Sequence, residues 1–298
     1  QIQSEWLKKA DLLTETLPFM KRYANKVIVV KFGGNAMGKK EYVSSFAEDI
    51  VLLQQVGMFP IVVHGGGPQI GEMLSKLKIR TEFIDGLRVT DSATIDVVEM
   101  VLSGVTNKSI VTAISNAGAK AVGISGKDGN LITAKRLMKM DKNSESNVER
   151  AIDLGFVGVP EKIDPQVIKA LINEKMIPVI APVGMGEDGL TYNINADTAA
   201  GAISASMKAS RMIMLTDVSG VFDKNRKLIP ELTINEALAL IKDKVVVGGM
   251  IPKLRTCIDA VEGGAEASVI MDGTIPHSLL LELFTEHGVG TIIRKNHS

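Results

Sequence analysis

The feature that most constrains the fold is an alternation of short apolar runs, rich in β-branched residues, with segments of helical periodicity. Such runs are typical of strands buried on both faces of a sheet. One intervening segment carries Val43, Phe46, Ile50 and Leu53 on a single helical face. The alternation predicts an α/β fold with a largely parallel sheet covered by helices on both faces. The predicted strands are 27–31 (VIVVK), 61–64 (IVVH), 177–181 (IPVIA), 212–215 (MIML) and 268–271 (SVIM).

Three more helices are expected from their spacing or their start signals. One carries an apolar stripe that ends at Leu77, and one begins at Asp164 as the N-cap with Pro165 at the first helical position. A third follows Pro252 and repeats apolar residues up to Val261. Each of these predicted helices lies between two predicted strands, which extends the alternation of strand and helix along the chain.

Two segments stand outside this alternation. Residues 135–150 are polar, and we expect an exposed excursion there. Residues 1–24 form an arm with Trp6, Leu13 and Leu17 on one helical face and with Pro18 expected to bend it. From the sequence alone the favoured interpretation is an arm packed on its own domain. The alternative is an arm that grips a neighbouring subunit.

Charge and cysteine content exclude several function classes. The chain has 34 basic and 34 acidic residues and no net charge, so nucleic acid is not an expected partner. Cys257 is the only cysteine, and the four histidines show no ligand spacing, so neither a disulfide framework nor a protein-bound metal site is predicted. No uninterrupted apolar run reaches the ~20 residues of a membrane helix. We expect no membrane partner and a cytoplasmic location.

Three predicted strands run directly into glycine-containing turns, KFGGN, HGGGP and TDVSG. Ligands of open α/β sheets collect at the carboxyl ends of the strands, where free backbone N–H groups are presented. Glycine lets phosphate or carboxylate oxygens approach that backbone closely. The three turns predict an anion-binding cleft. His64, between a buried strand and three glycines, is expected to be a hydrogen-bond donor at the strand end and not a base.

Two nucleotide-binding motifs are nearly matched. GGNAMGKK resembles a P-loop, but Lys40 stands where a Mg²⁺-binding hydroxyl is needed, so that fold is rejected. GGGPQIG, followed by Asp85, approaches a dinucleotide fingerprint with its third glycine displaced by one position. A dinucleotide-dependent oxidoreductase therefore remains the alternative enzyme class, although the sequence shows no group of residues suited to hydride transfer.

Four charged residues stand at strand and helix ends. Lys31 closes the first strand beside its glycine turn, and Lys253 opens a helix, where a cation is disfavoured unless an anion is near. Asp197 lies in the first turn of another helix, and Arg88 suits bidentate recognition of a carboxylate. The sequence shows no triad of nucleophile, base and acid. The three cations and one acid indicate instead a site that binds an anionic substrate.

The segments KFGGNAM, VVHGGGPQIG, FIDGLRVTD, YNINADTAA, LTDVSGVFD and GGMIPK together resemble the acetylglutamate kinases of the amino acid kinase family. The resemblance extends from about Lys26 to Thr291. It implies an αβα sandwich of two lobes, with the substrate lobe at 25–207 and the nucleotide lobe at 208–298. It also implies ATP-dependent phosphorylation of the side-chain carboxylate of N-acetyl-L-glutamate, in arginine biosynthesis, with Mg²⁺ carried by the nucleotide.

The resemblance assigns roles at each matching position. It implies that Lys31 and Lys253 neutralise the transferred phosphoryl group and that Asp197 orients both. The remaining implied residues hold the substrate (Gly65, Gly66, Arg88, Asn193) and the nucleotide (Gly34, Thr216, Asp217).

The arm and the carboxyl-terminal segment resemble those of arginine-inhibited hexamers in this family, built as trimers of dimers. The resemblance makes the arm a device for assembly and regulation, and it leaves open a PII-type protein as a further partner. A catalytically silent arginine sensor is the non-enzymatic alternative. The implied inhibitor-site residues are Tyr23, His277, Glu282 and Gly290.

Overall fold

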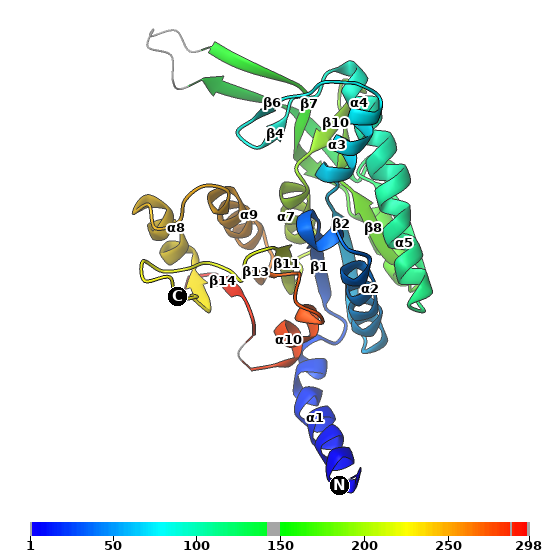
Figure 1. Cartoon of the computed structure of the whole chain (residues 1–298), viewed down its shortest axis with the longest axis vertical. Helices are drawn as coiled ribbons and strands as arrows, with labels where there is room; N and C mark the ends of the chain where they lie inside the picture. The colour runs from blue at the N-terminus through cyan, green and yellow to red at the C-terminus, as the bar shows by residue number, and fades with distance from the viewer. Residues whose placement is uncertain (1, 142–149, 287, 297–298) are drawn as a thin grey trace.

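The computed structural model describes residues 2–141, 150–286 and 288–296. Its main feature is an eight-stranded sheet whose strands are parallel except for the antiparallel β13–β14 pair (Figure 1). All five strands predicted from the sequence are present and adjacent in this sheet. In spatial order the strands are β12 (Glu231–Thr233), β14 (Thr291–Arg294), β13 (Ala267–Asp272), β11 (Arg211–Thr216), β1 (Val27–Phe32), β2 (Phe59–His64), β8 (Ile177–Ala181) and β5 (Ala121–Ser125).

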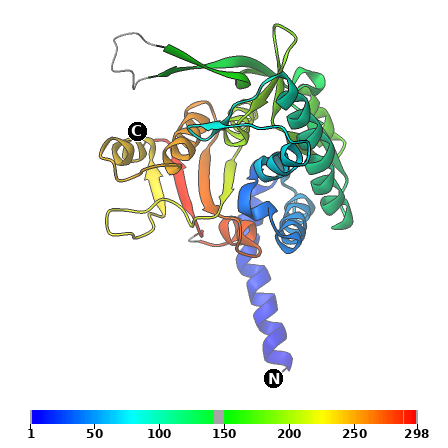
Figure 2. The same cartoon turned by 45° about the horizontal axis from the view of Figure 1, so that its top comes forward.

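Helices cover both faces of the sheet, as the alternating pattern predicted (Figures 1 and 2). The strand β1 shows why, because its side chains alternate between two apolar cores. Val29 belongs to one core, and Ile28 and Val30 belong to the other. The first core is covered by α6 (Gln166–Asn173), α7 (Ala196–Ser206), α8 (Ile234–Lys242) and α9 (Met250–Glu262), and the second by α2 (Lys40–Gln55), α5 (Asn107–Asn116) and α10 (Ser278–Phe284).

A smaller unit stands beyond the carboxyl ends of the main strands. Four strands close on one another there, and β6 and β7 continue outward as a long hairpin (Figures 1 and 2). The expected polar excursion at 135–150 is thus largely this hairpin, and its part at 142–149 lies outside the described residues. The strands are β6 (Ile132–Asp141), β7 (Arg150–Ile163), β9 (Val183–Gly186) and β10 (Thr191–Ile194).

A third apolar cluster lies beside this smaller unit. It contains side chains of α3 (Gly67–Lys76), α4 (Ser92–Glu99) and η2 (Met100–Thr106), the last being a π-helical stretch that continues α4 into α5. The short hairpin β3 (Phe83–Ile84) and β4 (Leu87–Arg88) follows α3. By length and mean hydropathy (1.3) alone, the continuous helix Ser92–Asn116 is long and apolar enough to cross a membrane, and 44% of its most apolar stretch is buried in the protein.

The arm forms one helix, α1 (Ile2–Tyr23), which includes Pro18 and extends away from the body (Figures 1 and 2). The favoured expectation that the arm packs on its own domain is wrong. Trp6 is 66% exposed and Leu13 is 67% exposed. Only the last turn, through Phe19 and Tyr23, joins the core of the body.

Two smaller expectations also need correction. Leu77, the last residue of its predicted stripe, is the C-cap of α3 and is 50% exposed, so the buried part of the stripe ends at Leu74. The helix α6 begins at Gln166 with Pro165 as its N-cap, one residue later than predicted, and Asp164 Oδ1 accepts a hydrogen bond from Gln166 N–H at 3.1 Å.

A buried acid ties α10 to α2. The carboxylate of Asp49 on α2 is 4% exposed, and its Oδ1 lies 2.6 Å from His277 Nδ1 at the N-cap of α10. Burial raises the pKa of Asp49 in spite of the opposing hydrogen bond from His277. The hydrogen bond and the charge of Asp49 raise the pKa of His277 above 6.5. The protonated histidine therefore stabilises the folded chain.

We expect this contact to make stability depend on pH above neutrality. Because the pKa of His277 is higher in the folded chain, its contribution is complete below about pH 6.5 and disappears as pH rises through the folded-state value. The thermal midpoint of the native protein should exceed that of His277→Gln at pH 6, and the difference should shrink by pH 9. The ring is half exposed, so the effect should not exceed about 1 kcal/mol. A difference that stays constant across this range would contradict the prediction.

Candidate active site

The three glycine turns meet at one edge of the sheet. They follow β11, β1 and β2, which are neighbours, so the turns lie side by side at the carboxyl ends of parallel strands (Figure 1). Gly65 N–H donates to Phe32 O at 2.9 Å and ties the second turn to the first. A Cβ on Gly33 would lie 3.2 Å from Gly65 N and from Lys31 Nζ, so glycine allows this close approach.

A cavity of about 280 Å³ opens above the turns after β1 and β2. It is closed on its other sides by the β3–β4 hairpin, by β10 and by the loop that leads into α7. Six of the residues named from the sequence line this one cavity: Lys31, Gly34, Gly65, Gly66, Arg88 and Asn193.

Asp197 joins two cations that come from different parts of the chain. Lys31 Nζ, at the end of β1, lies 3.0 Å from Asp197 Oδ1. Lys253 Nζ, in the first turns of α9, donates to Asp197 Oδ2 at 2.7 Å. Asp197 is held in the first turn of α7, whose N-cap Asn195 accepts a hydrogen bond from Thr198 N–H. The contact with Lys31 is an ion pair without a well-aligned hydrogen bond, whereas the contact with Lys253 has both.

The charge of Asp197 is fixed by these partners. Burial alone would raise the pKa of its carboxyl group, but the two ammonium groups outweigh burial and hold the pKa below its usual value of 3.8. Asp197 therefore stays ionised near neutral pH and is a poor proton acceptor. Two ammonium groups and one carboxylate leave a net positive charge, which favours an anion beside Lys31 and Lys253.

Arg88 reaches the cavity from β4 and is fixed on three sides. Its Nη1 donates to Thr81 Oγ1 at 2.9 Å, and its Nη2 donates to Gly67 O at 3.1 Å. The guanidinium also lies over the ring of Phe83, with 4.5 Å to the centroid. Partial burial lowers the pKa of Arg88, which still leaves the group charged. A positioned guanidinium of this kind suits a ligand carboxylate.

The two residues assigned to the nucleotide lie on the other side of the lysines. Thr216 ends β11, and its hydroxyl accepts a hydrogen bond from Val218 N–H at 3.0 Å. Asp217 follows directly. Neither residue lines the 280 Å³ cavity. Since β11 adjoins β1 with Lys31 opposite Met214, both residues lie next to the lysine site, on the side of the carboxyl-terminal strands.

The sequence did not identify the apolar walls of the cavity. Phe83, Leu102 and Val157 line it, and they come from β3, η2 and β7. Leu102 could not be recognised because it belongs to a long apolar helix in which a π-turn decides which side chains face inward. Val157 lies in β7, and its place in the cavity wall depends on pairing with Asn193 of β10, which is distant in the sequence.

A second cavity of about 280 Å³ lies where α1 meets α10 and β14. Tyr23, Glu282 and Gly290 line it, so three of the four residues implied for an inhibitor come together. His277 does not line this cavity, because it contacts Asp49. Glu282 Oε2 accepts from Val289 N–H at 2.8 Å and from Gly290 N–H at 3.3 Å. Further acidic and basic side chains around it are Arg22, Arg211, Glu231, Glu286 and Arg294.

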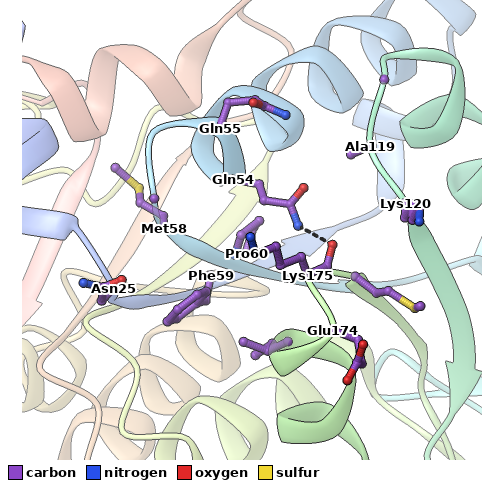
Figure 3. A pocket seen from close by; sticks show the side chains of 14 residues that line it. Asn25, Gln54, Gln55, Met58, Phe59, Pro60, Ala119, Lys120, Glu174 and Lys175 are labelled. Atoms are coloured by element: carbon purple, nitrogen blue, oxygen red, sulfur yellow. Dashed lines mark hydrogen bonds between the residues drawn. The ribbon is translucent and has the colours of Figure 1, made fainter.

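A more spacious cavity than these two lies at the opposite edge of the sheet. It measures about 640 Å³ and is bordered by residues that precede β1, β2, β5 and β8, including Asn25, Met58, Lys120 and Lys175 (Figure 3). Gln54 Nε2 donates to Lys175 O across it at 3.1 Å. Ligand sites of open α/β sheets form at the carboxyl ends of strands, so this amino-end cavity is not the candidate active site.

The geometry also bears on the dinucleotide fingerprint. In that motif the acidic residue follows the second strand of a βαβ unit. Here Asp85 occupies the turn between β3 and β4, with φ of 48°, and forms an ion pair with Lys139 of the long hairpin. GGGPQIG therefore lacks the strand context in which its acid would reach a ribose.

Comparison with known proteins places the chain in a family. The model of the amino acid kinase family matches residues 26–272. The acetylglutamate kinase of Rhodospirillum rubrum (strain ATCC 11170) is 59% identical over 294 residues, which are 99% of this chain and 95% of that protein. The acetylglutamate kinase of Gluconobacter oxydans (strain 621H) is 60% identical over 287 residues, with 96% and 97% covered.

Solved structures show the same fold at lower identity. The N-acetylglutamate synthase of Neisseria gonorrhoeae, complexed with coenzyme A and N-acetyl-glutamate, matches with a TM-score of 0.84 at 24% identity, over 97% of this chain and 64% of that one. The carbamate kinase of Giardia lamblia bound to AMP-PNP matches with a TM-score of 0.65 at 20% identity, over 92% and 100%. From the family match and the identity to its relatives, the chain is a kinase that belongs to the amino acid kinase family and, within it, to the acetylglutamate kinases.

Proposed function

We propose that this kinase transfers the γ-phosphoryl group of ATP to the side-chain carboxylate of N-acetyl-L-glutamate, giving ADP and N-acetyl-L-glutamyl 5-phosphate in arginine biosynthesis. The observation that carries the proposal is the Lys31–Asp197–Lys253 cluster at a cavity that also contains Arg88. The names of the relatives that are 59% and 60% identical support the choice of substrate.

The chemistry needs no general base. A carboxylate with a reference pKa of ~4.3 is already ionised at neutral pH. One of its oxygens attacks the γ-phosphorus, the bond from that phosphorus to the bridging oxygen breaks, and ADP leaves with the electron pair. The main obstacle is repulsion between two anions. Lys31 and Lys253 offset this repulsion, and Asp197 keeps both ammonium groups in place without taking up a proton.

Mg²⁺ enters the proposal with the nucleotide. Both oxygens of Asp197 face ammonium groups, so this carboxylate is not available as a metal ligand. No group of three or more His, Cys, Asp or Glu residues suited to a metal occurs within the described ranges 2–141, 150–286 and 288–296. Bound to the phosphates, Mg²⁺ would neutralise part of their charge. The chain itself supplies the lysines, the glycine N–H groups and alignment.

Two lobes divide the work in this proposal. Residues 25–207 supply β1, β2, β5 and β8 and the cavity, while residues 208–298 supply β11 to β14 and α9. Acetylglutamate would occupy the cavity with its α-carboxylate near Arg88, held further by Gly65, Gly66 and Asn193. The nucleotide would lie over β11, near Gly34, Thr216 and Asp217. Asp197 and Lys253 meet at the boundary between the two lobes.

The alternatives have less support. A silent arginine sensor has no need to keep Lys31, Asp197 and Lys253 in contact beside a cavity. A dinucleotide oxidoreductase would need an acid at the end of a strand, whereas Asp85 lies in a hairpin turn.

We further propose arginine as a feedback inhibitor at the cavity lined by Tyr23, Glu282 and Gly290. The carboxylates that line this cavity suit the guanidinium and ammonium groups of arginine. Arg211, whose guanidinium lies 5.3 Å from the centroid of the Tyr23 ring, suits the carboxylate of arginine. His277 would act on this site indirectly through α10, which carries Glu282 and begins next to His277.

We infer that α1 joins subunits into a hexamer built as a trimer of dimers. The apolar side chains along its first turns are exposed in the single chain, and an exposed stripe of this kind marks a contact surface. Because α1 ends at Tyr23, the assembly and the inhibitor cavity would be coupled. The cytoplasm is the proposed location, since it supplies ATP, and Cys257 is a free, buried thiol as expected in a reducing compartment.

The first prediction concerns the reaction. Purified enzyme should release ADP with acetylglutamate, and much less with glutamate or aspartate. Lys31→Ala and Lys253→Ala should each lower kcat by ~10²-fold or more, because each removes a charge that stabilises the transferred phosphoryl group. The matched control is Lys175→Ala, at the opposite edge of the sheet. A wild-type kcat in either active-site variant would reject its role.

Arg88 should act mainly on binding of the substrate. Arg88→Ala should raise the KM for acetylglutamate by about 10- to 100-fold, because it removes a fixed guanidinium from the site of a carboxylate. The KM for ATP should stay close to that of the native enzyme. If the KM for acetylglutamate did not change, Arg88 would have no part in holding it.

Arginine inhibition should depend on the carboxylate of Glu282. In Glu282→Gln the concentration of arginine giving half-inhibition should rise by about tenfold or more, since a charged hydrogen bond to the ligand is lost. The activity without arginine should stay unchanged. Equal inhibition of the native enzyme and the variant would move the site elsewhere.

The arm can be tested by its apolar stripe. Trp6→Ser combined with Leu13→Ser should reduce the molar mass measured by analytical ultracentrifugation from that of a hexamer to that of a dimer, because an apolar contact is lost. Exchanging the charged residues of the arm, Lys8→Gln and Lys9→Gln, serves as the control. If the double serine variant kept the native molar mass, α1 would not be the contact that joins the subunits.

A further inference from the structure

A buried chain of hydrogen bonds lies directly behind the glycine turn after β2. His64, the last residue of β2, is fully buried. Its Nδ1 lies 2.9 Å from Gly65 O, and its Nε2 lies 3.1 Å from Asn107 Nδ2 at the start of α5. Asn107 is fully buried as well. No step of the proposed reaction uses either residue, so their contacts need another explanation.

The direction of every hydrogen bond in this chain is determined by its outer partners. Lys108 Nζ can only donate, and it lies 2.8 Å from Asn107 Oδ1. Val179 O and Ile124 O can only accept, and they lie 3.0 Å and 3.3 Å from Asn107 Nδ2, so together with His64 Nε2 three acceptors share the two hydrogens of that nitrogen. The amide of Asn107 therefore directs its oxygen at Lys108 and its nitrogen at His64. Gly65 O can only accept, so the proton of the neutral His64 ring is on Nδ1 and is donated to Gly65 O, and the unprotonated Nε2 faces the Asn107 amide nitrogen as an acceptor.

The packing keeps this arrangement in place. Gly123 on β5 has no side chain because a Cβ there would overlap the amide oxygen of Asn107. Lys108 also donates to Gly123 O at 3.1 Å, which ties the amide to the edge strand. Burial lowers the pKa of His64 to about 4, so the ring is neutral near pH 7 and keeps an unprotonated nitrogen for Asn107.

The consequence for the cavity follows from peptide geometry. All peptide bonds in the described part of the chain are trans, and in a trans peptide the C=O of one residue and the N–H of the next point in opposite directions. Gly65 O faces the buried ring of His64, so Gly66 N–H points away from it. Gly66 borders the cavity, while the N–H of Gly65 is already used by Phe32 O.

We propose that His64 is a positioning residue, which holds the Gly65 carbonyl inside the protein and thereby directs Gly66 N–H at an anionic oxygen of the reacting groups. Asn107 fixes the tautomer of His64 that can do this. The acceptor is a carboxylate or phosphoryl oxygen, an assignment that rests on the proposed kinase reaction. Gly66 supplies the hydrogen bond itself, while Gly65 borders the cavity that would hold the substrate and carries the anchored carbonyl.

The space around Gly66 is too small for a side chain, so the group that position 66 presents to the cavity is its backbone N–H. A Cβ on Gly66 would lie 2.5 Å from Leu102 Cδ2 and 3.4 Å from Thr106 Oγ1. Both side chains belong to η2, which ends immediately before Asn107. The same helix thus packs against Gly66 and holds His64, so the donor is fixed from two sides.

Two substitutions of equal shape separate the hydrogen bond from simple packing. In His64→Asn the amide nitrogen takes the place of Nδ1 and can still donate to Gly65 O. His64→Leu has the same branched shape and no donor, and both variants lose the contact with Asn107. Val62→Ala, a buried change two residues earlier on the same face of β2, controls for a loss of stability. Thermal midpoints are measured for all three.

Steady-state ADP release with acetylglutamate is the activity readout. We expect His64→Leu to lower kcat by about tenfold or more, because the Gly65 carbonyl then loses its anchor and the Gly66 N–H is no longer held toward the anion. The kcat of His64→Asn should stay within about threefold of that of the native enzyme, because its amide keeps the anchor. The KM for ATP and the kcat of Val62→Ala should stay native. Equal loss in His64→Asn and His64→Leu, or no loss in either, would overturn the proposal.

A measurement on the ring does not depend on activity. The nitrogen-15 spectrum of histidine-labelled native protein at pH 7, with the His64 signals assigned by their absence in His64→Asn, should show Nδ1 protonated and Nε2 unprotonated. In Asn107→Asp the new carboxylate can only accept, so Nε2 should become protonated. A native ring protonated on Nε2 would overturn the proposal even if His64→Leu failed to fold. A native enzyme that releases no ADP would instead reject the kinase reaction and leave this spectrum informative.

Discussion

The site depends on one buried carboxylate between two ammonium groups. Asp197 lies within 3.0 Å of Lys31 and 2.7 Å of Lys253, and these three residues come from a strand, a helix and a second helix far apart in the sequence. Two like charges this close would repel each other strongly away from water. The ionised carboxylate of Asp197 between the two ammonium groups offsets their repulsion and leaves one net positive charge for an anionic ligand.

The sheet brings these groups together. In the parallel pairing of β11, β1 and β2, the carboxyl ends of the three strands form one edge, so their glycine turns and Lys31 are adjacent. The cavity proposed for the substrate lies above the turns after β1 and β2, and the residues proposed for the nucleotide follow β11. In the proposed division of binding, the boundary lies between β11 and β1, and the Asp197–Lys253 contact joins the two parts of the chain.

Backbone groups matter as much as side chains in this arrangement. The glycine turn after β2 has the N–H of Gly65 bonded to Phe32 and the carbonyl of Gly65 facing His64, so the N–H of Gly66 has a determined direction. A buried neutral histidine is suited to this task because it can donate at one nitrogen and accept at the other. Such networks are costly when incomplete, so the one behind the turn makes it rigid.

Much of this could be predicted from the sequence. All five predicted strands are present because runs such as IPVIA at Ile177–Ala181 are apolar on both faces, as a covered parallel sheet requires. Lys31, Gly66 and Arg88 were recognisable because glycine turns and charges at the ends of strands and helices are local features, whereas Asn193 came only from the resemblance of its motif, which also supplied the roles. The helical nature of the arm was also visible in its period, since that period depends only on neighbouring residues.

Only the tertiary structure decided the rest. The sequence favoured an arm packed on its own domain, but packing depends on whether a partner surface lies within reach, and no local pattern encodes that. The separation of His277 from Tyr23 and the role of Leu102 as a cavity wall likewise depend on contacts between distant segments. Local chemistry and spacing determined which residues could act on an anion. The long-range pairing of strands and helices determined which of them meet, because a distance between side chains is a property of the whole fold.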